Sequence, residues 1–154
     1  MPDLLVKLYE LPEFITVDGV TIRPGRSFER TKLRAFIETH FTPSWADEAD
    51  SGMTALPATT FLATVKDGDR SKIVGFASYD CTCRGYFGPT GVDPAHRGKG
   101  VGKALLLHTL HAMRHAGYAY AVIGSAGPVE FYQSFCGATV IDGSEPGFYT
   151  DLLA

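Results

Sequence analysis

A glycine-rich turn within residues 88–113 constrains the fold of this chain more than any other stretch. A strand-like run ends at Val92, Pro94 cannot continue a sheet ladder, and three glycines alternate over residues 98–102, where a helix begins. Closely spaced glycines let the backbone approach a ligand and point successive N–H groups into one small volume. The helix adds its own unpaired N–H groups and the positive end of its dipole. The turn therefore predicts a strand–helix unit with a site for a phosphate or pyrophosphate.

Two well-known phosphate loops do not fit this turn. A Walker A loop needs Gly, four residues and then Gly-Lys-Ser/Thr, but Asp93 stands five residues before Gly98, and Gly100 follows Lys99. A dinucleotide fingerprint needs Gly-x-Gly-x-x-Gly and an acidic residue about 20 positions further on. This chain has Gly-x-Gly-x-Gly, and it has no acidic residue between Asp93 and Glu130. The alternatives that remain are a loop for another phosphate-bearing ligand and an ordinary glycine-rich loop on a core helix, and the second would not explain three glycines and three cations together.

The turn resembles the cofactor loop of the GNAT superfamily of N-acetyltransferases. That family's pattern, Arg/Gln-x-x-Gly-x-Gly/Ala, is met by Arg97, Gly100 and Gly102, and its preceding Val-x-Pro is met by Val92 and Pro94. The resemblance implies acetyl-coenzyme A as co-substrate, with the backbone amides of residues 99–103 holding its pyrophosphate. The cofactor contacts that it implies come from Thr90, Val92, Arg97, Gly98, Lys99, Gly100, Val101, Gly102, Lys103, Ser125 and Phe131.

The order of predicted elements agrees with that family over nearly the whole chain. We expect one GNAT-like domain over residues 1–154, of mixed α/β (α+β) class. Its sheet should be mostly antiparallel, with a central parallel strand pair splayed around the cofactor and helices on both faces. Strands are predicted at 4–8, 20–23, 60–65, 72–79, 86–92, 118–123, 138–141 and 148–153, and helices at 27–40 (capped by Ser27), from the glycine turn to about 116, and from 128 to about 136. The segment 42–57 reads as irregular with room for a short helix, and Gly88-Pro89 predicts a bulge.

Composition and charge exclude several classes of partner. A net charge of −3 gives no basic surface for nucleic acid, so no nucleic-acid partner is expected. No apolar run approaches the roughly 20 residues that a membrane helix needs, so we expect no membrane partner. Three cysteines form neither an even disulfide set nor a zinc quartet, which favours a reducing, cytoplasmic setting.

Acetyl transfer from a thioester needs a neutral amine, a stabilised oxyanion and a proton for the leaving thiolate. The backbone N–H of Val92, beside the predicted bulge, is a candidate for the oxyanion. Tyr132 resembles the family's tyrosine on the last helix, which implies that it is the catalytic acid. Tyr132 also stands at core-facing helical spacing with Val129, so a purely structural aromatic is the alternative.

Two departures from the family pattern surround this tyrosine. Gly137 lies five residues after Tyr132, whereas the family commonly has glycine at four. Ser125 and Pro128 stand where the family commonly has asparagine and alanine. A serine hydroxyl or the backbone must therefore replace the usual contact with the pantetheine arm.

The general base and a metal site have weaker signals. Asp80, Asp93, His96 and Glu145 are all candidates for the base, and water is another, because family members often deprotonate the amine through water. His108, His111 and His115 share a helix face, but no carboxylate or cysteine follows at the next turns, so no metal is expected.

The acceptor is expected to be a small molecule or a peptide with a primary amine. In the family, the segment corresponding to residues 42–57 forms one wall of the acceptor site. Here it places Asp47, Glu48 and Asp50 beside Trp45, which favours a cationic acceptor, although a solvated acidic loop is the alternative. The leading hypothesis is direct acetyl transfer through a tetrahedral intermediate; the alternative is a non-catalytic acyl-coenzyme A-binding or sensing module. A homodimer is also possible, since dimers are frequent in the family.

Overall fold

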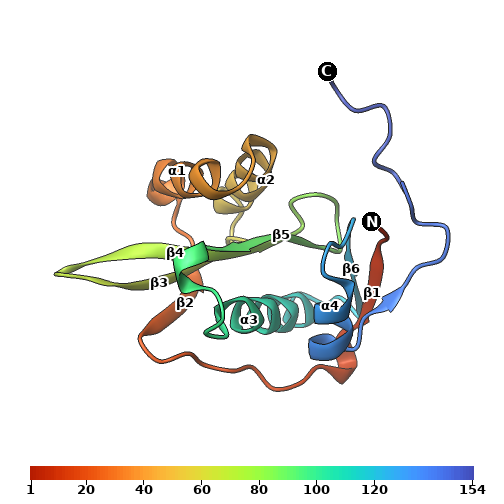
Figure 1. The fold of residues 1–154 in the computed structure, drawn as a ribbon, viewed down its shortest axis with the longest axis horizontal. Coiled ribbons are helices and arrows are strands. Elements are labelled where there is room, and N and C mark those ends of the chain that lie inside the picture. The colour runs from red at the N-terminus through yellow and green to blue at the C-terminus, as the bar shows by residue number, and fades with distance from the viewer.

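The computed structural model describes all 154 residues, and its centre is a seven-stranded mixed sheet (Figure 1). In chain order the strands are β1 Leu4–Lys7, β2 Val20–Pro24, β3 Thr60–Asp67, β4 Arg70–Tyr79, β5 Tyr86–Val92, β6 Tyr120–Ile123 and β7 Thr139–Val140. Across the sheet their order is β2-β3-β4-β5-β6-β1-β7. Every neighbouring pair is antiparallel except β5 and β6, which are parallel. The predicted mixed sheet with one parallel pair is confirmed.

Four α-helices and three short 3₁₀ helices cover the two faces of the sheet. The α-helices are α1 Arg30–His40, α2 Pro43–Met53, α3 Val101–His115 and α4 Val129–Cys136, and the 3₁₀ helices are Leu8–Glu10, Ser27–Glu29 and Pro94–His96. Figure 1 shows α1 and α2 on one face, and α3 and α4 on the other. Helix α3 is the crossover between the parallel strands β5 and β6. No helix has both the length and the apolar character needed to span a membrane.

Side chains that alternate along the central strands build two apolar cores. Leu62 and Phe76 pack with α1 and α2, whereas their neighbours Phe61 and Ala77 pack on the face covered by α3. This period of two follows from the pleat, which turns successive side chains to opposite faces of a sheet. Burying a side chain such as Leu62 stabilises the fold by about 1.5–3 kcal/mol, so both helical layers are fixed to β3 and β4.

The parallel pair β5–β6 is short because the two strands diverge after two residue pairs. Tyr86 pairs with Val122 and Phe87 with Ile123, and the pairing then ends at Gly88-Pro89. On its other edge β5 stays paired with β4, apart from a register shift opposite Gly88-Pro89. Proline has no N–H to give to a ladder, and the extra residue of a bulge bends the strand. The predicted bulge and splay are confirmed.

Two local predictions are wrong. Ser27 does not cap the first helix: residues 27–29 form a 3₁₀ turn, and the Glu29 side chain accepts a hydrogen bond from the backbone N–H of Arg26. The predicted last strand, 148–153, does not form. The first strand β1 occupies the sheet position beside β6, and positive φ angles at Gly147 and Asp151 interrupt an extended path.

The contact between Gly91 and Phe41 joins α1 to β5 closely enough to test. A Cβ added to Gly91 would lie 2.4–2.9 Å from three carbons of the Phe41 ring. We therefore expect Gly91→Ala to lower the free energy of unfolding by about 1–3 kcal/mol in urea titrations, because the ring must move. In the control Gly127→Ala, the new Cβ meets only the Met1 Sδ at 3.6 Å, and the change should stay within about 0.5 kcal/mol. Equal effects of the two substitutions would contradict the contact.

Candidate active site

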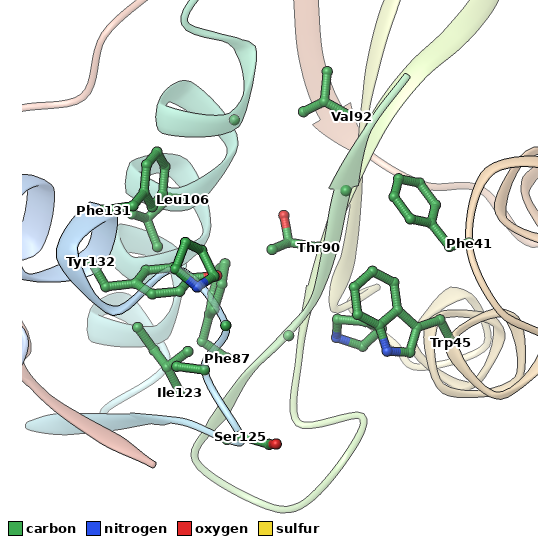
Figure 2. Close-up of a pocket in the computed structure, with 18 of the residues that line it drawn as sticks. Phe41, Trp45, Phe87, Thr90, Val92, Leu106, Ile123, Ser125, Phe131 and Tyr132 are labelled. Atoms are coloured by element: carbon green, nitrogen blue, oxygen red, sulfur yellow. The ribbon is translucent and has the colours of Figure 1, made fainter. Parts of the chain in front are cut away.

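A cleft of about 1480 Å³ opens where β5 and β6 diverge (Figure 2). Its walls come from the start of α3, from α4, from Phe41 just after α1, from α2, and from the segment that follows β7. Single small-ligand pockets usually measure about 300–1000 Å³, so this cleft has room for two ligands that meet. The predicted site residues that line it are Thr90, Val92, Arg97, Gly98, Gly100, Val101, Gly102, Lys103, Ser125, Phe131 and Tyr132. Lys99 is exposed outside the lining.

One end of the cleft is built to bind an anion. Gly100 precedes α3 with a φ of 86°, a left-handed conformation that favours glycine, and no side chain caps the first N–H groups of the helix. The cations of Arg97 and Lys103 line the same end. Arg97 Nε donates to the Val92 carbonyl at 3.2 Å, and Lys103 Nζ lies 4.4 Å from the centre of the Phe135 ring. Free amides, a helix dipole and two positioned cations together favour a phosphate group.

The middle of the cleft is edged by the unpaired side of β5. The N–H of Asp93 donates to the Val74 carbonyl on β4. Because peptide groups of a strand alternate between its two edges, those of Thr90 and Val92 point away from β4 and into the gap. The bond from Arg97 to the Val92 carbonyl agrees with this direction. Two backbone N–H groups are therefore available along the cleft.

Tyr132 faces this edge from the opposite wall. It is only 6% exposed, packs edge-to-face against Phe87 at 6.3 Å, and extends from α4 toward Thr90 (Figure 2). Burial raises the pKa of Tyr132 to about 12. The phenol therefore stays protonated at neutral and moderately alkaline pH and can donate a proton into the cleft.

The other end of the cleft is aromatic and carries one carboxylate. The rings of Phe41 and Trp45 are stacked at 5.4 Å, and both line the cleft (Figure 2). Glu48, one turn further along α2, lines it too and accepts a hydrogen bond from the Thr82 hydroxyl at 2.6 Å. Of the carboxylates in the chain, Glu48 is the one in the lining.

The rest of the predicted acidic cluster turns away from the cleft. Asp50 pairs with Arg30 at 2.6 Å and with Arg34 at 3.4 Å, and Asp47 pairs with Arg34 at 2.9 Å. The Arg30 guanidinium lowers the pKa of Asp50 below its ordinary value. The short helix for which the sequence analysis left room within residues 42–57 is α2, and these ion pairs join it to α1. Asp47 and Asp50 therefore join α2 to α1, and Glu48 is the residue of the cluster that faces the cleft.

Tyr149 is a lining residue that the sequence analysis missed. A Cβ added to Gly124 would lie 2.2 Å from the Tyr149 hydroxyl, so this tyrosine packs closely against the start of the β6–α4 loop. Burial and, after it, the nearby Asp3 carboxylate raise the pKa of Tyr149 to about 12. Sequence patterns assigned this residue to a strand and offered no signal that it would enter a cleft.

The four candidate bases lie in different places in the structure, and the histidines of α3 make separate contacts. Of the four candidate bases, His96 is the one that lines the cleft. Asp80 accepts from Tyr118, Asp93 accepts from the Ala95 N–H, and Glu145 pairs with the N-terminal amine. On α3, His111 Nε2 lies 2.7 Å from the Pro12 carbonyl, and His115 Nδ1 lies 2.7 Å from the carbonyl of His111. No group of three or more metal-ligating side chains forms a potential metal site.

Comparisons with known proteins agree with this architecture. The model of the acetyltransferase (GNAT) family matches residues 27–138. A GCN5-related N-acetyltransferase from Sphaerobacter thermophilus superposes with a TM-score of 0.72, with 20% identity over 91% of this chain and 48% of that one. The glucosamine N-acetyltransferase region of a fungal multi-domain beta-N-acetylglucosaminidase gives a TM-score of 0.70, with 14% identity over 91% of this chain and 19% of that one.

A third solved structure contains a ligand. A GNAT family acetyltransferase from Brucella melitensis in complex with acetyl-CoA has a TM-score of 0.55, with 20% identity over 75% of this chain and 80% of that one. At these identities the likeness supports the fold. The chain spans about half the length of the Sphaerobacter protein and about a fifth of the fungal one. No curated protein matches the sequence.

Proposed function

This chain belongs to the acetyltransferase (GNAT) family, and from that premise we propose that it transfers an acetyl group from acetyl-coenzyme A to a primary amine. The observation that carries the proposal is the opposite charge of the two ends of the cleft. Free amides with Arg97 and Lys103 stand at one end, Glu48 stands at the other, and Tyr132 lies on the wall between them. A polyanionic donor and an amine acceptor can enter such a cleft from opposite ends.

The residues present fit acetyl-coenzyme A, the acetyl donor of this family. Its pyrophosphate suits the amides of residues 99–103, which begin α3 beside the two cations. Its pantetheine arm carries amides that can pair with the free edge of β5 at Thr90. Ser125 and Phe131 line the same path from the opposite wall, as expected for groups that hold the arm.

The chemistry needs only groups that this cleft holds. Acetyl-coenzyme A supplies the acetyl group as a thioester. The N–H of Val92 stabilises negative charge on the acetyl oxygen while the amine nitrogen bonds to the carbonyl carbon. The carbon–sulfur bond then breaks, Tyr132 gives its proton to the leaving sulfur, and the nitrogen loses its surplus proton to water.

The acceptor proposed for this site is a small cationic amine. Glu48 attracts a cation, and its bond from Thr82 fixes the position of the carboxylate. The stacked rings of Phe41 and Trp45 lie beside it and present aromatic surface to the same ligand. The acidic cluster thus supports the cationic acceptor through Glu48 alone.

One assay separates this enzyme from the alternative, a non-catalytic acyl-coenzyme A-binding module. Acetyl-coenzyme A is incubated with a panel of primary amines of different charge, and free thiol is followed. Amine-dependent thiol release supports the transferase. A rise in melting temperature with coenzyme A, but no thiol release with any amine, favours the binding module.

The glycine turn gives the first prediction for this function. Gly100→Val should abolish the rise in melting temperature that coenzyme A causes, because a β-branched side chain disfavours the left-handed backbone that aims the amides. Gly68→Val is the matched control, since Gly68 also has a positive φ and open space around it but lies in the β3–β4 hairpin. A full coenzyme A shift in Gly100→Val would refute the assignment of this turn.

The acid role of Tyr132 predicts a defect in turnover. Tyr132→Phe should lower kcat by about 10–10⁴-fold and leave the coenzyme A-induced shift in melting temperature intact. Because the pKa of Tyr132 is raised to about 12, wild-type kcat should not fall as pH rises through 10, the ordinary value for tyrosine. Equal turnover of the two proteins rules out the acid role.

The acceptor proposal predicts an effect of Glu48 that depends on salt. Glu48→Gln should raise the KM of the best cationic amine about 5–30-fold, more at low ionic strength than at high, because a screened charge attracts less. The KM for acetyl-coenzyme A should not change. Asp47→Asn is the control, because that carboxylate is bound to Arg34 outside the cleft. An acceptor with net negative charge, or a KM insensitive to Glu48→Gln, would argue against a cationic substrate.

A further inference from the structure

Ser125 lines the cleft in an unusual backbone conformation. Its φ is 46°, and it is one of three non-glycine residues with a positive φ. A residue held in the left-handed region costs of order 1 kcal/mol or more, and it persists only when its surroundings fix it. Figure 2 places Ser125 on the wall formed by the loop after β6. Something behind this loop must therefore hold its backbone.

The support comes from Asp3, at the beginning of the chain. The Ser125 N–H donates to Asp3 Oδ1 at 2.7 Å, and the next N–H, of Ala126, donates to the Pro2 carbonyl at 2.8 Å. Asp3 is only 5% exposed, and its Oδ2 lies 3.5 Å from the Tyr86 hydroxyl. The side chain of Asp3 therefore lies outside the lining of the cleft and contacts the loop from behind.

Asp3 is itself fixed in place. It is the residue just before β1, its N–H lies 2.9 Å from Ser144 Oγ, and its carbonyl accepts from the Ile141 N–H at 2.9 Å. The pairing of β1 with β6 starts at the adjacent Leu4. The carboxylate consequently has little freedom to follow the loop, and the loop must conform to it.

We propose that Asp3 is a positioning residue for the acetyl donor. By binding the Ser125 N–H, it fixes the left-handed turn that presents the Ser125 hydroxyl to the pantetheine arm. Ser125 thereby replaces the family's asparagine contact, because the buried carboxylate just before β1 orients this short side chain. This inference rests on the proposed function, since it assumes that the arm lies along this wall.

The proposal predicts a defect confined to the donor and a non-additive double variant with Ser125. Asp3→Ala should raise the Kd for coenzyme A and the KM for acetyl-coenzyme A about tenfold, with the acceptor KM changed less than about twofold. Ser125→Ala, which lacks the hydroxyl, should raise the same two constants by a similar factor, and the double variant Asp3→Ala/Ser125→Ala should bind no more weakly than Asp3→Ala, because Asp3 acts through that hydroxyl. Asp3→Asn keeps an oxygen acceptor and should bind coenzyme A within about threefold of wild type. Asp142→Ala, an exposed carboxylate on the segment after β7, is the control.

Each outcome of this experiment decides the proposal. Wild-type coenzyme A affinity in Asp3→Ala overturns it. If Ser125→Ala weakens binding as much in the Asp3→Ala protein as in wild type, or if the acceptor KM rises as much as the donor KM, Asp3 only stabilises the fold. If Asp3→Ala does not fold, Asp3→Asn decides, and a rise in Kd above about tenfold overturns the proposal. If wild-type protein neither binds coenzyme A nor releases thiol, the proposed function fails, and that result is distinct from a failure of the Asp3 inference.

Discussion

The divergence of β5 from β6 is the constraint on which the rest of this structure depends. Two parallel strands that separate after two residue pairs leave a row of backbone N–H and carbonyl groups without a partner. Such groups are costly to bury, so this edge must face either water or a ligand. The divergence begins at Gly88-Pro89, where the proline cannot donate to a ladder and the extra residue of the bulge bends β5.

The two helical layers then give the two ends of the resulting cleft different chemistry. Helix α3 begins at the cleft, so its dipole and free amides add positive potential where Arg97 and Lys103 already lie. Helix α2 contributes an aromatic surface and Glu48 instead. The ion pairs that join α1 to α2 use the other acidic residues, so one carboxylate is left facing the cleft.

The wall opposite β5 depends on contacts between residues far apart in the sequence. Strand β1 pairs with β6 and β7, and Asp3 just before it binds the loop that carries Ser125. The same region receives Tyr149, whose hydroxyl packs against Gly124. The shape of this wall is therefore set by the beginning and the end of the chain together, although both lie far in sequence from the glycine turn.

The sequence alone determined the features that depend on local chemistry. The glycine turn, the helix after it, the bulge at Gly88-Pro89 and Tyr132 on the last helix were all readable, because turn residues and helical periodicity act over a few positions. The tertiary structure decided which strand lies beside β6, and the sequence pattern at 148–153 could not show that β1 takes that place. It also separated Glu48 from Asp47 and Asp50 and brought Asp3 to Ser125. Those outcomes depend on pairing and packing between distant segments, and local propensity carries no information about such contacts.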